Sequence, residues 1–176
     1  MTQLYKPGIL GVVFFWLALA GLHAEVAVTL ATDLQDDARN ARSRELPILL
    51  AFSAIDCSYC EELEEEFLEP MLLSGEYREK ILIRKLVLDN GSRVTDFSGN
   101  RVDATELADR YRVFVTPTLL FVDTRGQELA QRMVGINTLE LFGGYLDECI
   151  ETALLNLRAP EKLAGLPGCR LVSPRP

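Results

Sequence analysis

Apolar and polar positions fall into blocks along the chain that predict a succession of strands and helices. Two apolar runs, 47–53 and 81–88, are too short for helices and are typical of strands buried on both faces. A third run, 118–122, precedes a glycine-containing turn and a partner stretch at 127–134, which predicts a β-hairpin. Residues 25–31 form a further candidate strand.

Helical patterns fill most of the sequence between these runs. Thr32 at the N-cap and Gln35 at the third helical position fit a capping box, so we expect a helix from there to about Arg44. A similar signal at Asp103 predicts a helix to about Tyr111. A long amphipathic pattern occupies 138–157.

The helix that begins around Cys57 is the most informative of these segments. Its inward stripe comprises Cys60, Leu63 and Phe67. Pro70 is expected to interrupt it before a second short helix at 71–80. Residues 89–103 are polar and read as a long loop.

The predicted order is βαβ, then α, then ββ, then α. A βαβ unit requires parallel strands joined by a right-handed crossover, and the hairpin adds an antiparallel edge. We therefore expect the α/β class, with a central mixed sheet.

The first 24 residues have the features of a secretory signal peptide. Lys6 precedes an apolar run at 9–22 that ends in small residues up to Ala24. This run of about 14 residues is shorter than the roughly 20 needed to span a bilayer. We expect cleavage after Ala24, with Ala20 as the second choice; an uncleaved membrane anchor is the alternative. The remaining 152 residues, 176 minus 24, suffice for one domain.

The charge and composition of the chain argue against two classes of function. A net charge of −8 argues against nucleic acid as a partner, because phosphate binding needs clustered lysine and arginine. The only histidine, His23, lies in the predicted signal peptide. The mature chain would then have no catalytic histidine and no histidine-ligated metal.

Cys57 and Cys60 are the candidate redox pair. The amide groups and dipole of a helix N-terminus favour a thiolate there, and the thiolate is the form that attacks disulfides. We therefore expect Cys57 to be the attacking thiol and Cys60 the resolving one. Neighbouring acidic residues such as Asp56 and Glu61 oppose the thiolate, so the effect should be modest.

Two other uses of this pair are less favoured. Half of a zinc site would need further ligands, and the other two cysteines are not spaced as a second CxxC. A purely structural staple would gain little, because disulfide stabilisation grows with loop length. We accordingly expect no metal and no cofactor.

Three segments carry a resemblance to the thioredoxin superfamily. "PILLAFSAIDCSYC", "IRKLVLDN" and "VFVTPTLLFVDTRGQ" follow that family in order and spacing over about residues 46–157. The chain is most similar to exported thioredoxin-related proteins, including the SoxW-like group. The resemblance implies a thioredoxin fold, a cis Pro117 facing the dithiol, and substrate binding by Ser58, Tyr59, Thr116 and Pro117.

The sequence also departs from thioredoxin itself. Ser58-Tyr59 replaces Gly-Pro between the cysteines, and Asp56 replaces the preceding tryptophan. Ala51 stands where thioredoxin has a buried aspartate that helps to move protons. Lys85 matches a family lysine near that site, with an ordinary solvated lysine as the alternative. The resemblance therefore fixes neither turnover rate nor redox potential.

Cys149 and Cys169 form the second cysteine set. We expect a structural disulfide that ties the tail, 159–176, to the last helix. A buried Cys149 with a free Cys169, and a second relay pair, are the alternatives.

Together these observations predict a periplasmic thiol-disulfide reductase of protein or small-molecule disulfides, kept reduced by a membrane thiol electron donor. The domain would span 46–158, after a signal peptide at 1–24 and an N-terminal extension at 25–45. The choice of reductase rests on the resemblance. The alternatives are a non-enzymatic thioredoxin-fold binding module and a disulfide oxidant or isomerase.

Overall fold

A computed structural model of the chain describes residues 26–158 and Cys169. The predicted signal peptide and most of the predicted tail lie outside these residues. Within the described part of the chain, no helix is long and apolar enough to cross a membrane.

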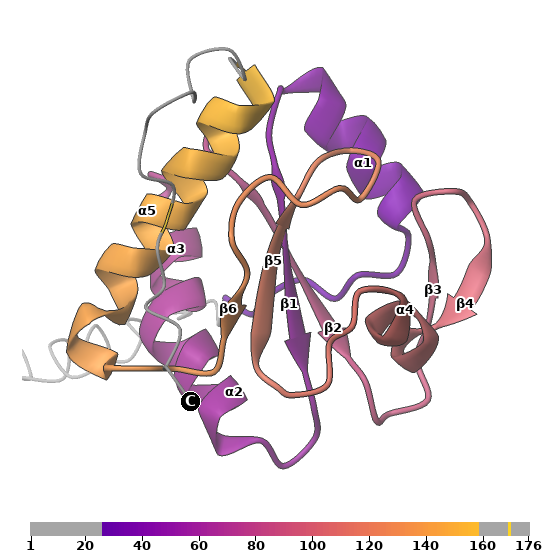
Figure 1. Cartoon of the computed structure of the whole chain (residues 1–176), viewed down its shortest axis with the longest axis horizontal. Coiled ribbons are helices and arrows are strands. Elements are labelled where there is room, and N and C mark those ends of the chain that lie inside the picture. Colours follow the sequence, from indigo (N-terminus) through magenta and orange to yellow (C-terminus); the bar gives the residue numbers. More distant parts are fainter. Residues whose placement is uncertain (1–25, 159–168, 170–176) are drawn as a thin grey trace, which may run out of the picture.

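Four strands form a central mixed sheet in the order β2-β1-β5-β6 (Figure 1). They are β1 (Ile48–Ser53), β2 (Leu82–Val87), β5 (Thr118–Val122) and β6 (Met133–Val134). β1 pairs parallel with β2 and antiparallel with β5, which in turn pairs antiparallel with β6. The parallel βαβ unit and the antiparallel hairpin predicted from the sequence are therefore present.

Helices cover both faces of this sheet (Figure 1). α2 (Ser58–Leu63), the π-helical turn η1 (Glu64–Leu68), α3 (Glu69–Ser74) and α5 (Leu139–Arg158) lie on one side. α1 (Leu34–Ser43) and α4 (Ala104–Arg110) lie on the other. Each face has its own core, because residues alternate between faces along a strand: Leu49 and Ala51 pack with the first group, Leu50 and Phe52 with the second. β1 is buried along its whole length, as its apolar run predicts.

The N-terminal segment packs against this domain. Ala31, Leu34 and Ala38 belong to the core beneath α1. The predicted strand at 25–31 is wrong: Lys85 exchanges backbone hydrogen bonds with Thr29 and Ala31 of this segment, and this single bridge replaces a strand.

Two helix termini differ from the sequence prediction. α1 is capped by Asp33, one residue later than expected, because its carboxylate accepts a hydrogen bond from the Asp36 N–H at 2.8 Å. Pro70 does not interrupt the helix after Cys57. The turn before it widens, with the Glu69 N–H bonded to the Glu64 carbonyl, which accommodates a residue that lacks an N–H. The helical run instead ends at Gly75, with φ of +73°.

The edge strands of the sheet and the segment 89–103 also differ from the sequence prediction. β2 is an edge strand, and its buried residues are Ile83 and Leu86 rather than the whole run. The predicted loop at 89–103 contains a separate hairpin, β3 (Arg93–Thr95) and β4 (Arg101–Asp103). Its strands are three residues long and largely polar, so they leave little trace in the hydrophobic pattern. β6 is shorter than 127–134, since only two residues keep the regular pairing.

Candidate active site

Cys57 caps the N-terminus of the helical run formed by α2, η1 and α3. Its backbone is extended, with φ of −105°, and its carbonyl accepts hydrogen bonds from the N–H groups of Cys60 and Glu61. The Cys57 Sγ accepts a further hydrogen bond from the Cys60 N–H at 3.2 Å. A sulfur at this position faces the unsatisfied amides and the positive end of the helix dipole.

The structure joins Cys57 and Cys60 in a disulfide with an S–S distance of 2.07 Å. Cys57 is half-buried, whereas Cys60 is only 2% exposed and packs on the inward side of α2. A thiol or disulfide that approaches from solvent therefore reaches Cys57 before Cys60. This asymmetry agrees with the roles that we predict for the two cysteines.

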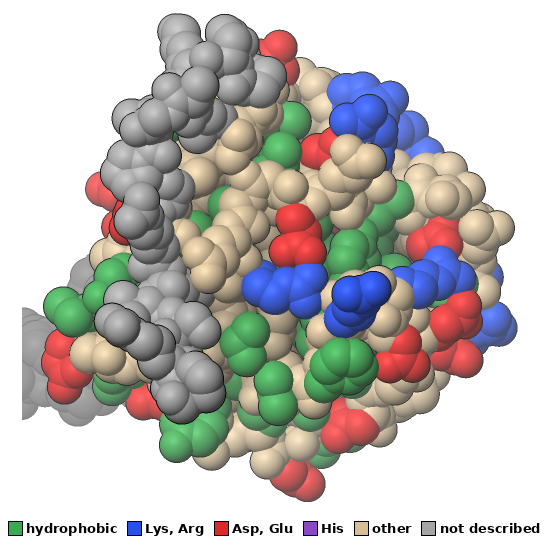
Figure 2. Space-filling model, viewed as in Figure 1, with side chains coloured by type: hydrophobic (Ala, Val, Ile, Leu, Met, Phe, Trp, Pro, Cys, Tyr) green, Lys and Arg blue, Asp and Glu red, His purple; other side chains and the backbone are tan. Residues whose placement is uncertain are grey.

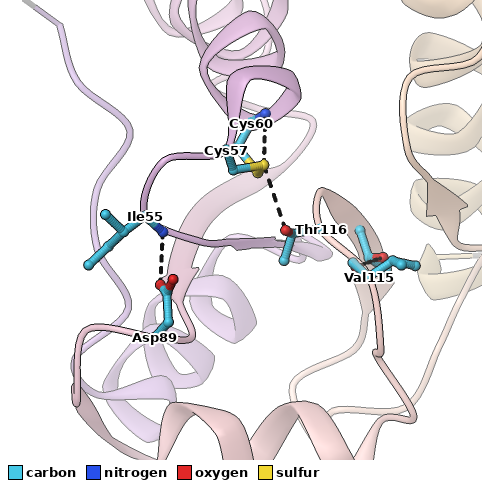
Figure 3. Close-up of a disulfide and its surroundings, with 7 residues drawn as sticks. Ile55, Cys57, Cys60, Asp89, Val115 and Thr116 are labelled. Atoms are coloured by element: carbon cyan, nitrogen blue, oxygen red, sulfur yellow. Dashed lines mark hydrogen bonds between the residues drawn. A yellow bond between two sulfur atoms is a disulfide. The ribbon is translucent and has the colours of Figure 1, made fainter.

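Thr116 faces this disulfide from the loop before β5 (Figure 3), and Pro117 follows it in the chain. The Thr116 hydroxyl donates a hydrogen bond to the Cys57 Sγ at 3.6 Å. The peptide bond between Thr116 and Pro117 is cis, and Pro117 is buried. The Thr118 hydroxyl donates to the Val115 carbonyl at 2.7 Å, which holds the loop against the strand. The structure thus brings together residues that are 59 positions apart in the sequence.

Ser58 and Tyr59, the dipeptide between the cysteines, are both exposed. They belong to the first turn of α2, so they lie on the solvent side of the disulfide. Their placement leaves both side chains free to contact a bound substrate.

Asp89 is a site residue that the sequence analysis did not identify. Its carboxylate accepts a hydrogen bond from the Ile55 N–H at 2.8 Å (Figure 3). This bond fixes the turn that leads into Cys57, in which Asp56 has a φ of +53°. A signal existed, because Asp89 directly follows the predicted strand 81–88 and parallel strands end at the same edge of a sheet.

Exposed apolar side chains lie next to the cysteine pair and to Thr116 in the sequence, and of these the sequence analysis identified Tyr59 alone. Ile55, Tyr59, Phe114 and Val115 are between 53% and 79% exposed. We call these four residues the apolar rim. Figure 2 shows hydrophobic side chains gathered over the loop that joins α4 and β5. Four large apolar groups beside one disulfide are typical of a surface that contacts another polypeptide.

Cys149 and Cys169 form a second disulfide away from this centre. Cys149 lies in α5 and is fully buried, and Cys169 is 3% exposed. Their bond fixes one point of the chain beyond α5 to the core under that helix. Buried sulfurs of this kind are out of reach of a protein substrate.

The site contains no cluster of metal ligands. No group of three or more histidine, cysteine, aspartate or glutamate side chains in the described ranges is arranged to hold a metal ion.

Comparison with protein families matches residues 34–150 to the thioredoxin-like domain. Among solved structures, a thioredoxin from Thermus thermophilus is 17% identical, with a TM-score of 0.54, over 77% of this chain and 94% of that one. The DsbH oxidoreductase is 20% identical, with a TM-score of 0.52, over 77% of this chain and 92% of that one. These likenesses concern the fold. No curated protein sequence matches the chain.

The family match covers two thirds of the sequence and includes every residue of the Cys57 centre. The matched region carries the CxxC disulfide at a helix N-terminus, with the Thr116-Pro117 loop facing it. The chain therefore belongs to the thioredoxin-like domain family and is a thiol-disulfide oxidoreductase.

Proposed function

We propose that the protein is an exported reductase of disulfide-bonded substrates, in which Cys57 is the nucleophile and Cys60 resolves the intermediate. The observation that carries this proposal is the unequal burial of the two sulfurs at a helix N-terminus. The more accessible sulfur, the Cys57 Sγ, accepts hydrogen bonds from both the Cys60 N–H and the Thr116 hydroxyl.

The reaction follows from this geometry in two exchanges. The Cys57 thiolate attacks one sulfur of the substrate disulfide, forms a mixed disulfide and releases the other substrate sulfur as a thiolate. Cys60, as a thiolate, then attacks the Cys57 Sγ. The bond between Cys57 and the substrate breaks, the second substrate thiolate leaves, and the Cys57–Cys60 disulfide forms. The substrate gains two electrons and the enzyme loses two.

The apolar rim supports polypeptides as the substrates. A peptide lying across Cys57 would cover Tyr59 on one side and Phe114 and Val115 on the other, all strongly exposed. Burial of apolar surface contributes about 25 cal/mol per Å², so even a short peptide gains affinity there. Small disulfides such as glutathione cover less of the rim, so we expect weaker binding for them.

Variants of the two cysteines test these roles. Cys57→Ser should abolish reduction of insulin disulfides, whereas Cys60→Ser should accumulate a mixed disulfide between Cys57 and the substrate. Equal activity in wild-type protein and Cys57→Ser would eliminate the assigned nucleophile. Trapping by Cys60→Ser in cells would also name the natural substrates.

The direction of the reaction and the location are parts of the same proposal. The leader-like residues 1–24 support export, and a reductase in an oxidising compartment needs a thiol donor in the membrane. Rapid alkylation of cells, followed by mass analysis, would show whether Cys57 and Cys60 are mostly reduced. A largely reduced pair and a mature N-terminus at Glu25 are expected, and a stably oxidised pair would instead indicate a disulfide oxidant.

A further inference from the structure

A cleft of about 400 Å³ lies beside the buried sulfur of the active-site disulfide. Cys60, Glu64 and Lys85 are among its lining residues, together with the end of β1. The cleft is open to solvent, although Cys60 itself is almost fully covered. The cleft therefore connects the surroundings of Cys60 with bulk water.

An ion pair lies within this cleft. The Lys85 Nζ donates to the Glu64 Oε2 at 2.5 Å, and the two side chains are only 20% and 16% exposed. Lys85 lies two residues after Ile83, a core residue beneath α2 and α5, so both side chains face that side of the sheet. In the β1–β2 register Lys85 is opposite Ala51, whose small side chain leaves room for the pair.

Glu64 differs from the other carboxylates around this cleft. It follows Cys60 by four residues on one continuous helix, so the two side chains share a face. The other acidic lining residues are Asp56, Glu61, Glu65 and Glu69. Among the residues that the structure describes, none of those four has an ion-pair partner, and Asp56, Glu61 and Glu65 are exposed.

We propose that Glu64 accepts the proton of Cys60 through a water molecule in this cleft when Cys60 resolves the mixed disulfide. The thiol form of Cys60 cannot attack, because the thiolate is the nucleophile in disulfide exchange. The S–H bond of Cys60 breaks, its proton passes to the Glu64 carboxylate, and its electron pair forms the bond to the Cys57 Sγ. The substrate leaves as a thiolate. The proton then leaves Glu64 for solvent through the open cleft.

Lys85 holds Glu64 in place for this step. Its ammonium group keeps the carboxylate within the cleft instead of extended into solvent, as the neighbouring Glu65 is. The inference rests on the proposed roles of Cys57 and Cys60, so the test must separate the two exchanges.

A single turnover of the reduced protein with a symmetrical chromogenic aromatic disulfide separates the two thiol-disulfide exchanges. The first equivalent of coloured thiolate reports attack by Cys57, and the second reports resolution by Cys60. Glu64→Gln should slow the second phase at neutral pH by about 100-fold, the lower end of the range for general-base catalysis. The first phase should stay within about twofold. The deficit should shrink as the pH rises, because the thiol then ionises without Glu64.

Electrostatics alone predicts the opposite result. Loss of a negative charge beside Cys60, with the Lys85 cation retained, favours the Cys60 thiolate and should accelerate the second phase. Glu65→Gln is the matched control: it removes the same charge from an exposed neighbour in the same cleft and should leave both phases unchanged. A second phase in Glu64→Gln that is unchanged or faster than in wild type overturns the proposal.

Two further variants guard against a folding artefact. Glu64→Asp keeps a carboxylate and should recover part of the lost rate. The double variant Glu64→Gln/Lys85→Met leaves no unpaired charge and should be as slow as Glu64→Gln. If it resolves at the wild-type rate, Glu64 is not the proton acceptor. Loss of the first phase in wild-type protein would instead contradict the proposed role of Cys57.

Discussion

The hydrogen bond from Thr116 to Cys57 should set part of the redox potential. The bond is present in the disulfide form, with the Thr116 hydroxyl 3.6 Å from the Cys57 Sγ. On reduction the same sulfur can carry a negative charge, and a hydrogen bond to an ionised acceptor is roughly twice as strong as one to a neutral acceptor. Thr116→Val keeps the shape of the side chain and removes the donor, so it should destabilise the reduced form more than the oxidised form.

The size of the effect follows from hydrogen-bond energies. A net bond to a charged group contributes about 1.5–3 kcal/mol and a neutral one about 1 kcal/mol. The difference therefore lies between about 0.5 and 2 kcal/mol, and at this long distance we take a value in the lower half of that range, about 1 kcal/mol. For a two-electron couple about 1.4 kcal/mol corresponds to 30 mV, so the potential of Thr116→Val should be lower by roughly 20–30 mV.

Equilibration with glutathione buffers of graded ratio, followed by alkylation and mass analysis, measures this shift. Thr118→Val is the control, since its hydroxyl bonds to the Val115 carbonyl in the same loop without touching the cysteines. Its potential should match that of wild type. An unchanged or higher potential in Thr116→Val would refute the argument that this hydroxyl stabilises the reduced form.

Three further changes test the scaffold. Hydrogen bonds, among them one from Arg110, lower the pKa of Asp96 even though its burial alone would raise it. The Asp96 carboxylate therefore stabilises the fold fully above the pKa of an unfolded aspartate, about 3.9, and this stabilisation is lost as the pH falls through the lower pKa of the folded state. Asp96→Asn should therefore lower the free energy of unfolding, measured with urea, by about 1–3 kcal/mol at pH 7 and by less in acid. An equal loss at both pH values would contradict this prediction. Gly126→Ala should lower stability by more than about 1 kcal/mol in thermal unfolding, because φ is +80° and the added carbon meets the Tyr111 hydroxyl; a neutral effect would contradict the turn. Cys149→Ser/Cys169→Ser should lose about 3 kcal/mol, as expected for opening a loop of 20 residues, yet keep its reductase activity; loss of activity in the folded variant would instead indicate a relay role.

The parts of the fold that the sequence predicts well are those in which one face or a whole element is buried. The run 47–53 is apolar up to Ser53 because β1 lies at the centre of the sheet. Cys57 and Cys60 could be assigned to a helix start because their spacing, the preceding strand and the following stripe agree. The hairpin at β3 and β4 could not be found this way, since hydrogen bonds to Asp96 organise its turn and few of its side chains are buried.

The candidate site likewise combines residues that the sequence identifies with contacts that only the fold creates. The resemblance identified Ala51 as a lost acidic position, but it could not show that Glu64 and Lys85 meet beside Cys60. Their pairing depends on the helix face at residue 64 and on the β1–β2 register, which are properties of the fold. The apolar rim depends on loops that converge from distant segments, and local patterns do not encode such convergence.

Alkylation of the reduced protein across a pH series tests the central claim most directly. Cys57 should react first, and its rate should rise at a lower pH than that of free cysteine, while Cys60 stays protected. Peptide mass analysis assigns each modification. If Cys57 reacts no faster than free cysteine at any pH, or if Cys60 is modified before it, then the helix N-terminus does not supply the nucleophile that this account requires.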